Sequence, residues 1–305
     1  MQIYNEPPSL GKLRRGLYRC RMALLRVAAC QLLTSPDPSV SVVAVLEWME
    51  NARETGCDVV AFPEACLCGY AAGDDYWRQA QPVPFLEAEQ RVQEAARKLH
   101  LAVVLGTVHW EDGEGPFNSL LAVDRDGLVR GRYSKIHLAE SWPLPGRSLP
   151  VYELASVASC FLVCHDIRYP ELVRLPAAVG ARICYYCSNE SGLLSEQKLS
   201  AYRAMPISRA TENSIFLIMA NAPANAHDLH SSSQSHGNSM IVHPDGRVLA
   251  EAGHFTEQLV VADIELSEAT GQLARRAVDD DTILHDWMRA GVRLVQNGDQ
   301  GDDRS

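Results

Sequence analysis

A cysteine whose neighbours favour reactivity occurs in the segment SCFLVCHDIRYPEL, residues 159–172. Cys160 lies inside an apolar run, whereas Cys164 ends that run, and a helix is expected to begin within a turn of it, near Tyr169 or Pro170. The N-terminus of a helix favours a thiolate, because its dipole end is positive and its first backbone N–H groups are free. The pattern predicts that Cys164 is the reactive thiol and that Cys160 belongs to the core.

A glutamate at the end of one expected strand and a lysine inside another are further candidates. In VVAFPEACLCGY, Glu64 follows a buried apolar run, and α/β folds present reactive groups where strands end. In GRYSKIHLAE, Lys135 lies inside an expected strand, where a lysine usually faces solvent or protects a sheet edge. Taken singly, each residue is more simply interpreted as solvent-facing. The functional alternative is a cation that lies against a carboxylate.

The elements that would carry these residues alternate between strand and helix. Apolar runs predict strands, and apolar residues at helical spacing predict helices. The expected strands are 25–32, 57–64, 101–110, two around DRDG within 117–138, 160–166, 181–189, 214–222, two around PDG within 238–253, and 258–266, and the expected helices are 37–56, 87–100, 169–180 and 195–213. Pro176 and Pro206 are expected to interrupt two of these helices. The order predicts one α/β domain with helices covering a mixed sheet system.

The composition is that of a globular protein in a reducing compartment. The chain has 305 residues, of which 47% are hydrophobic and 22% charged, and this length can bury a sizeable core. A net charge of −10 argues against a general nucleic-acid binder, which needs a basic surface. The nine cysteines are an odd number in a long chain, which argues against a secreted disulfide framework and favours a cytoplasmic protein.

The two ends differ from the middle of the chain. Residues 1–24 form a basic extension, interpreted as a segment ahead of the first strand, with a mitochondrial presequence as the alternative. The following apolar stretch is too short to span a membrane. The folded domain is expected over residues 25–295, and the polar tail 296–305 is expected to be disordered.

Four segments, FPEACLCGY, YSKIHLAE, LVCHDIRYPEL and RATEN, resemble the nitrilase superfamily of carbon–nitrogen hydrolases in their order and spacing. The resemblance covers residues 25–266 and implies a four-layer αββα sandwich that pairs into homodimers, or higher homo-oligomers, through its outer helices. It also implies a catalytic triad of Glu64, Lys135 and Cys164. A second glutamate often follows the lysine in this family, and Glu140 is the candidate here, in a loop that is shorter than usual.

Such a trio can hydrolyse the C–N bond of an amide or N-carbamoyl group in two steps. Cys164 would attack the carbonyl carbon and form a thioester, while Glu64 would carry the thiol proton to the departing ammonia or amine and then activate water. Lys135 and the backbone N–H of His165 would stabilise the oxyanion. This chemistry requires no metal and no organic cofactor, and its substrate would be a small molecule.

Three residues are expected to bind the substrate: Tyr70, Arg168 and Asn189. Tyr70 and Asn189 are expected at the pocket mouth. The planar guanidinium of Arg168 suits a substrate carboxylate, and the alternative is an internal pair with Asp166 or Glu171. The segment HDIRYPE is closer to amidase and carbamoylase members of the family than to true nitrilases.

Three other functions are compatible with parts of this sequence: acyl transfer to an amine, ligand binding without catalysis, and a metal or redox site. Within the family, the acyl group could pass to an amine instead of water, and a non-catalytic binding module could use the same fold. A metal or redox site is suggested by CYYC at 184–187 and by several histidines. However, that pair lies in a strand-like run without a second closely spaced pair, and a redox motif should open a helix.

Overall fold

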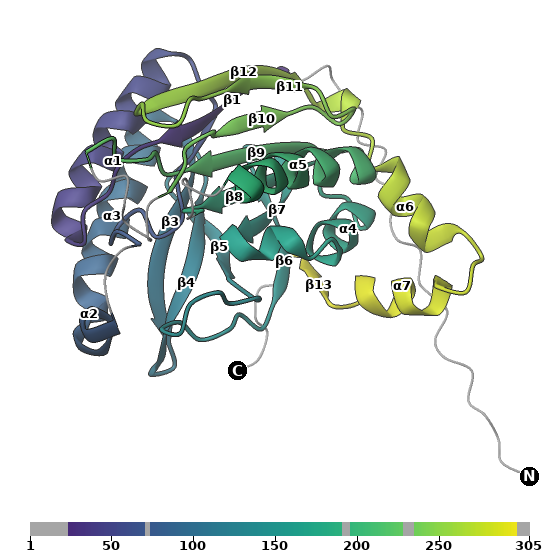
Figure 1. The fold of residues 1–305 in the computed structure, drawn as a ribbon, viewed down its shortest axis with the longest axis horizontal. Coiled ribbons are helices and arrows are strands. Elements are labelled where there is room, and N and C mark those ends of the chain that lie inside the picture. Colours follow the sequence, from purple (N-terminus) through teal and green to yellow (C-terminus); the bar gives the residue numbers. More distant parts are fainter. Residues whose placement is uncertain (1–23, 71–73, 191–195, 228–234, 298–305) are drawn as a thin grey trace, which may run out of the picture.

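The computed structural model of the protein describes residues 24–70, 74–190, 196–227 and 235–297. Two β-sheets pack face to face and helices cover their outer faces, with α1 and α3 on one side and α4 and α5 on the other (Figure 1). The helices are α1 (Pro38–Glu54), α2 (Asp74–Gln79), α3 (Pro82–Leu99), α4 (Glu171–Ala178), α5 (Glu196–Asn213), α6 (Gln272–Asp279), α7 (His285–Val292) and the 3-10 turns η1 (Cys164–Arg168) and η2 (Leu266–Glu268). The expected four-layer αββα sandwich is confirmed.

The first sheet has the strand order β12-β1-β2-β3-β4-β5. Its strands are β1 (Leu24–Gln31), β2 (Val59–Ala61), β3 (Ala102–Glu111), β4 (Glu114–Val123), β5 (Val129–Ser134) and β12 (Gln258–Glu265). Along β1, Val27 and Ala29 pack into the core between the sheets, whereas Ala28 and Cys30 belong to the core formed with α1 and α3. Successive side chains point to opposite faces of a strand, so a strand buried on both faces is mostly apolar.

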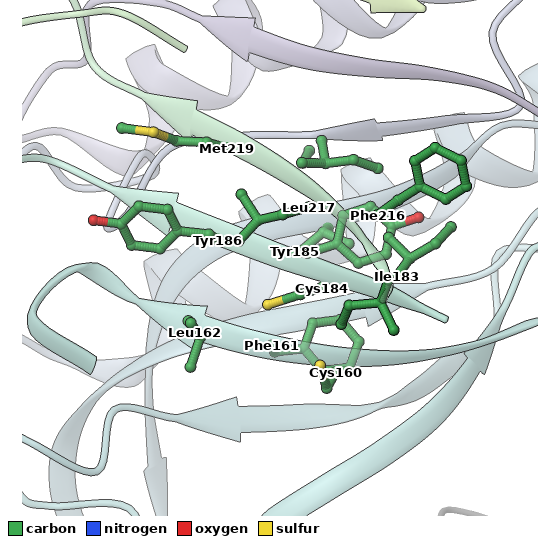
Figure 2. Packing of buried hydrophobic residues seen from close by; sticks show 14 of the residues in the cluster. Cys160, Phe161, Leu162, Ile183, Cys184, Tyr185, Tyr186, Phe216, Leu217 and Met219 are labelled. Carbon is green, nitrogen blue, oxygen red and sulfur yellow. The ribbon is translucent and has the colours of Figure 1, made fainter. Parts of the chain in front are cut away.

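The second sheet has the order β11-β10-β9-β8-β7-β6-β13. Its strands are β6 (Leu149–Leu154), β7 (Val157–Val163), β8 (Ile183–Ser188), β9 (Phe216–Asn221), β10 (Met240–Val242), β11 (Val248–Glu251) and β13 (Val295–Asn297). The parallel strands β7, β8 and β9 place Cys160 beside Cys184 and Cys184 beside Leu217, all fully buried (Figure 2). The prediction that Cys160 belongs to the core is confirmed, and the CYYC pair lies within a core strand.

The two helix prolines do not interrupt their helices, contrary to the prediction. Pro176 lies inside α4, which continues to Ala178, and Pro206 lies inside α5. A proline removes one backbone N–H and crowds the preceding turn. Both helices bury apolar side chains against the second sheet, such as Val173 and Ala210, and this packing preserves the helix on both sides of each proline.

The ordered structure continues beyond the predicted start of the tail. β13 pairs in parallel with β6, with Gln296 opposite Pro150 and Asn297 opposite Val151, so the first two residues of the predicted tail are strand residues. The rest of that tail, 298–305, and residues 1–23 of the predicted extension lie outside the described residues. None of the described helices combines the length and the hydrophobicity needed to cross a membrane.

Candidate active site

Cys164 lies at the carboxyl end of β7, as the first residue of the 3-10 turn η1. Its φ angle is 44°, a left-handed conformation that is uncommon for a residue with a side chain and that often marks a functional turn. The residue is only 7% exposed. The helix expected to begin near Tyr169 or Pro170 is α4, which starts at Glu171 with Pro170 as its N-cap, and the short turn η1 separates it from Cys164.

The carboxylate of Asp166 ties this turn to the end of β5. Its Oδ2 accepts hydrogen bonds from the Tyr133 hydroxyl at 2.8 Å and from the Val163 backbone N–H at 3.2 Å, and its Oδ1 accepts one from the His137 N–H at 2.8 Å. Asp166 is fully buried, and burial raises its pKa to about 6. These bonds fix the turn that carries Cys164 against the strand that leads to Lys135.

Glu64 is buried just beyond the end of β2 and accepts three hydrogen bonds. Its Oε1 lies 2.9 Å from the Lys135 Nζ and 2.7 Å from the Asn118 Nδ2, and its Oε2 accepts the Asn189 backbone N–H at 2.9 Å. Burial raises the pKa of Glu64 to about 7, although the Lys135 cation opposes this shift. A carboxyl with a pKa near 7 can accept and return a proton at neutral pH.

Lys135 bridges Glu64 and a second carboxylate, that of Glu140. The Lys135 Nζ donates to Glu140 Oε1 at 2.5 Å, and the Tyr70 hydroxyl donates to the same oxygen at 2.6 Å. Burial disfavours the Lys135 cation, but Glu64, Cys164 and Glu140 together raise its pKa above the usual value, so it stays charged. Burial also acts to raise the pKa of Glu140, but Lys135 outweighs it and lowers that pKa below its usual value.

The Cys164 thiol is surrounded by more carboxyl groups than cations. Burial raises its pKa above the usual value, Glu190 and Glu64 raise it further, and Lys135 lowers it only in part. The raised pKa differs from the sequence-based expectation of a thiolate, because burial and the neighbouring carboxyl groups favour the thiol. Removing the thiol proton requires a nearby base.

Arg168 contacts Tyr202, and not Asp166 or Glu171, which the sequence suggested as internal partners. Its Nη2 donates to the Tyr202 hydroxyl at 3.1 Å, and its Cζ lies 5.3 Å from the centre of that ring. Within the described part of the chain, Arg168 forms no ion pair with Asp166 or Glu171. The guanidinium is exposed and retains N–H donors for a ligand.

The other expected residues contribute in specific ways. Asn189 reaches the site through its backbone N–H, which donates to Glu64 Oε2. Tyr70 is half-buried and reaches the site through Glu140. His165 is the second residue of η1, and the first N–H groups of a helical turn have no acceptor within that turn.

Two polar residues of this region were missed by the sequence analysis. Asn118 lies on β4 and is fully buried, and its backbone oxygen accepts the Lys135 N–H at 2.8 Å. A polar residue within the apolar run FNSLLAV was the available signal for it. Glu190 is 2% exposed and directly follows Asn189. Adjacent residues of an extended chain point to opposite sides, and the sequence alone does not say which of the two points inward.

The described residues contain no cluster of side chains that could form a metal site. Within the ranges given above, no three His, Cys, Asp or Glu side chains come together as a group that could bind a metal ion. Cys184 and Cys187 are free, fully buried thiols of β8.

Comparison with known sequences gives one family match. The family model described as carbon–nitrogen hydrolase matches residues 26–273. The chain is 28% identical to omega-amidase NIT2 of Homo sapiens, covering 81% of this chain and 91% of that protein. It is 29% identical to 2-oxoglutaramate amidase of Bacillus subtilis, covering 73% and 84%. It is 27% identical to the fusion protein NitFhit of Caenorhabditis elegans, of which it spans only 59%.

Solved structures agree with this match. An amidase from Nesterenkonia sp. has a TM-score of 0.71 and 26% identity, covering 84% of this chain and 97% of that one. A mutant of the Nesterenkonia sp. AN1 amidase, with 25% identity and a TM-score of 0.71, carries the acetamide moiety of fluoroacetamide on its active-site cysteine. In that relative, the cysteine is therefore the residue that becomes covalently modified.

Proposed function

The chain belongs to the carbon–nitrogen hydrolases of the nitrilase superfamily, and on this premise we propose that Glu64, Lys135, Cys164 and Glu140 form the active site of a cysteine-dependent amidase. The proposal is carried by the two contacts of the Lys135 Nζ, which lies 2.9 Å from the buried carboxylate of Glu64 and 2.5 Å from that of Glu140. Cys164, on a strained turn, is close to this group of charges. The two carboxyl groups have pKa values shifted in opposite directions, which suits one of them for proton transfer and the other for a fixed charge.

In the first half of the reaction, the Cys164 Sγ attacks the amide carbonyl carbon. Glu64 accepts the thiol proton as the C–S bond forms, and passes it to the leaving nitrogen as the C–N bond breaks. Ammonia or an amine leaves, and the acyl group remains as a thioester on Cys164. The thiol needs this base because its own pKa is raised by burial.

In the second half, Glu64 accepts a proton from water, whose oxygen attacks the thioester carbon. The C–S bond breaks, the carboxylic acid product leaves, and the proton returns to the Cys164 sulfur. In both halves, negative charge develops on the carbonyl oxygen. The third hydrogen of the Lys135 ammonium group and the N–H of His165 are the donors proposed for that oxygen.

The proposed substrate is a small linear amide or N-carbamoyl compound. Relatives are named omega-amidase and 2-oxoglutaramate amidase, and the exposed guanidinium of Arg168 supports binding of a substrate carboxylate at the far end of the acyl chain. Arg168 lies four residues after Cys164, at the other end of the same 3-10 turn, so an acyl chain that reaches both residues would be short.

Ammonia release from primary amides and N-carbamoyl compounds tests the proposal, with Cys164→Ala as the inactive variant and Cys160→Ala as the matched control. Both cysteines are buried and lie four residues apart, but only Cys164 is at the strand end. Release by the wild type and by Cys160→Ala, but not by Cys164→Ala, is expected. Release that persists without the Cys164 thiol, or no release from any compound by the wild type, would reject the proposed function.

We also propose that the chain forms homodimers. Ile283, Leu284 and Trp287 are exposed apolar residues at and just before α7, and an apolar surface of this kind suits contact with a second copy. Sedimentation equilibrium of the wild type and of Trp287→Glu measures the assembly. A dimer that the substitution weakens is expected, and a monomeric wild type would contradict this proposal.

A further inference from the structure

Glu190 is a buried carboxyl group that the reaction above does not use. Its Oε1 accepts the Tyr186 hydroxyl at 2.5 Å, and the Tyr202 hydroxyl is a second hydrogen-bond partner of its side chain. Its backbone N–H donates to Asn221 Oδ1 at 3.0 Å, which fixes the chain just beyond β8. Glu190 is therefore an ordered part of the site and not a freely moving loop residue.

This carboxyl group forms no direct ion pair in the described part of the chain. Lys135 and Arg168 influence its pKa, but Arg168 donates its hydrogen bond to the Tyr202 hydroxyl. The equally buried Glu89 is paired with Arg132, and Glu64 and Glu140 share Lys135. Burial raises the pKa of Glu190, and the hydrogen bonds from Tyr186 and Tyr202 and the charges of Lys135 and Arg168 oppose this shift only in part. A cationic ligand in direct contact would supply the ion pair that the buried carboxylate lacks.

The position of Glu190 is close to the reacting sulfur. β7 and β8 are parallel neighbours, with Val163 opposite Cys187, so the residues that follow each strand emerge at the same edge of the sheet. Among the charged groups around the Cys164 thiol, Glu190 has the largest effect on its pKa, which it raises. A cation against Glu190 would relieve this effect and make the thiol easier to deprotonate.

We propose that Glu190, together with Tyr186 and Tyr202, is the specificity site for the acyl group and that it binds a protonated amino group of the substrate. The aromatic rings of the two tyrosines add a surface on which an ammonium group is stabilised. This inference rests on the proposed function, and it names the substrate class: amides whose acyl chain carries an ammonium group. With a carboxylate at Arg168, which contacts the same Tyr202 hydroxyl, the preferred acyl group is that of an α-amino acid ω-amide.

Four amides that differ only in these two groups test the inference: butanamide, 4-aminobutanamide, glutaramate and L-glutamine. The measured quantity is the ratio of kcat/KM for an amide with the amino group to that for its partner without it. This ratio is expected to be about tenfold or more in the wild type, the size expected for one charge-assisted hydrogen bond. Because it is a ratio within one enzyme, partial loss of folded protein does not affect it.

The informative variant is Glu190→Gln, which retains an acceptor for the tyrosine hydroxyls but carries no charge. The ratio is expected to fall close to one in this variant and to stay at the wild-type value in Glu54→Gln, the same chemical change at an exposed position of α1. A wild-type ratio near one, or a ratio that Glu190→Gln retains, would overturn the inference.

A second measurement decides the inference even if the wild type hydrolyses none of the amides. The Cys164 thiolate displaces methanesulfinate from 2-aminoethyl or methyl methanethiosulfonate and forms a mixed disulfide, which mass spectrometry of the Cys164 peptide follows. The cationic reagent is expected to react faster relative to the neutral one in the wild type than in Glu190→Gln. Equal relative rates in the two proteins would overturn the Glu190 site, whereas a preserved preference without amide hydrolysis would reject only the proposed function.

Discussion

The Nζ of Lys135 lies 2.9 Å from the Oε1 of Glu64, and both side chains are fully buried although the residues are 71 positions apart in the chain. A buried ion pair of this kind contributes little stability in itself, because both charges lose their hydration. Its value lies in setting the two protonation states: the lysine stays charged, and the carboxyl can exchange a proton near neutral pH. The predictions below follow from this arrangement and from the groups that fix it.

Replacing Lys135 by methionine is expected to damage both folding and activity. Glu64 and Glu140 would be left buried without their shared cation, and removing one partner of a buried pair costs about 3–5 kcal/mol of the free energy of unfolding. Denaturant unfolding measures the loss, and ammonia release measures the activity. Lys98→Met, at the exposed end of α3, is the control, and equal unfolding free energies of the two variants would show that Lys135 is not a buried partner.

The pH dependence of kcat/KM is expected to follow the ionisation of Glu64. Burial raises its pKa to about 7, so the carboxylate that we propose as the base for the thiol proton becomes protonated as the pH falls through 7. Activity should therefore decrease below about pH 7, rather than below the range near pH 4 that an ordinary glutamate would give. Initial rates at low substrate concentration between pH 5 and 9 measure this limb.

The raised pKa of Glu64 affects the stability of the fold in the opposite direction from its effect on activity. A carboxyl pKa that is higher in the folded than in the unfolded state favours the folded state at low pH, and this contribution is lost as the pH rises through about 7. Glu64→Gln should remove this part of the pH dependence and reduce kcat/KM by about 10²–10⁴. An activity limb near pH 7 that persists in Glu64→Gln would assign the ionisation to another group.

Asp166→Asn is expected to loosen the turn that carries Cys164. The carboxylate accepts from two backbone N–H groups and one hydroxyl, and an amide NH2 at either oxygen position would face a donor instead. The expected cost is about 1–3 kcal/mol of the free energy of unfolding, together with a fall in kcat at nearly constant KM. Asp112→Asn, in the exposed β3–β4 turn, is the matched control, and a kcat equal to that of this control would show that Asp166 does not position the nucleophile.

Tyr70→Phe is expected to weaken the fixed charge of Glu140. The variant loses the 2.6 Å hydrogen bond to Glu140 Oε1, and the pKa of Glu140 should rise because its ionised form loses a donor. One such bond corresponds to about a tenfold decrease in kcat/KM. Tyr76→Phe, whose hydroxyl donates to the Pro36 backbone oxygen at the surface, serves as the comparison. A decrease of the same size in both variants would indicate a general loss of stability.

Much of the fold could be predicted from the chain because local patterns determine it. The apolar run around Val59 and the DRDG and PDG turns predicted strands and hairpins that the structure contains, because a strand buried on both faces is apolar and a tight turn needs residues such as Asp and Gly. The failures have the same explanation. Pro206 was expected to interrupt a helix on local grounds, but the packing of the helix against the sheet preserves it.

The sequence by itself determined that the thiol of Cys164 and the carboxyl of Glu64 stand at strand ends. It predicted Lys135 inside a strand, whereas in the structure this residue directly follows β5. The tertiary structure decided everything that depends on which groups face one another, because side-chain contacts across two packed sheets join residues far apart in the chain. It placed Lys135 between Glu64 and Glu140, gave Arg168 the Tyr202 hydroxyl as its partner and turned Glu190 inward. The directions of the pKa shifts are also tertiary properties, since burial and neighbouring charges set them.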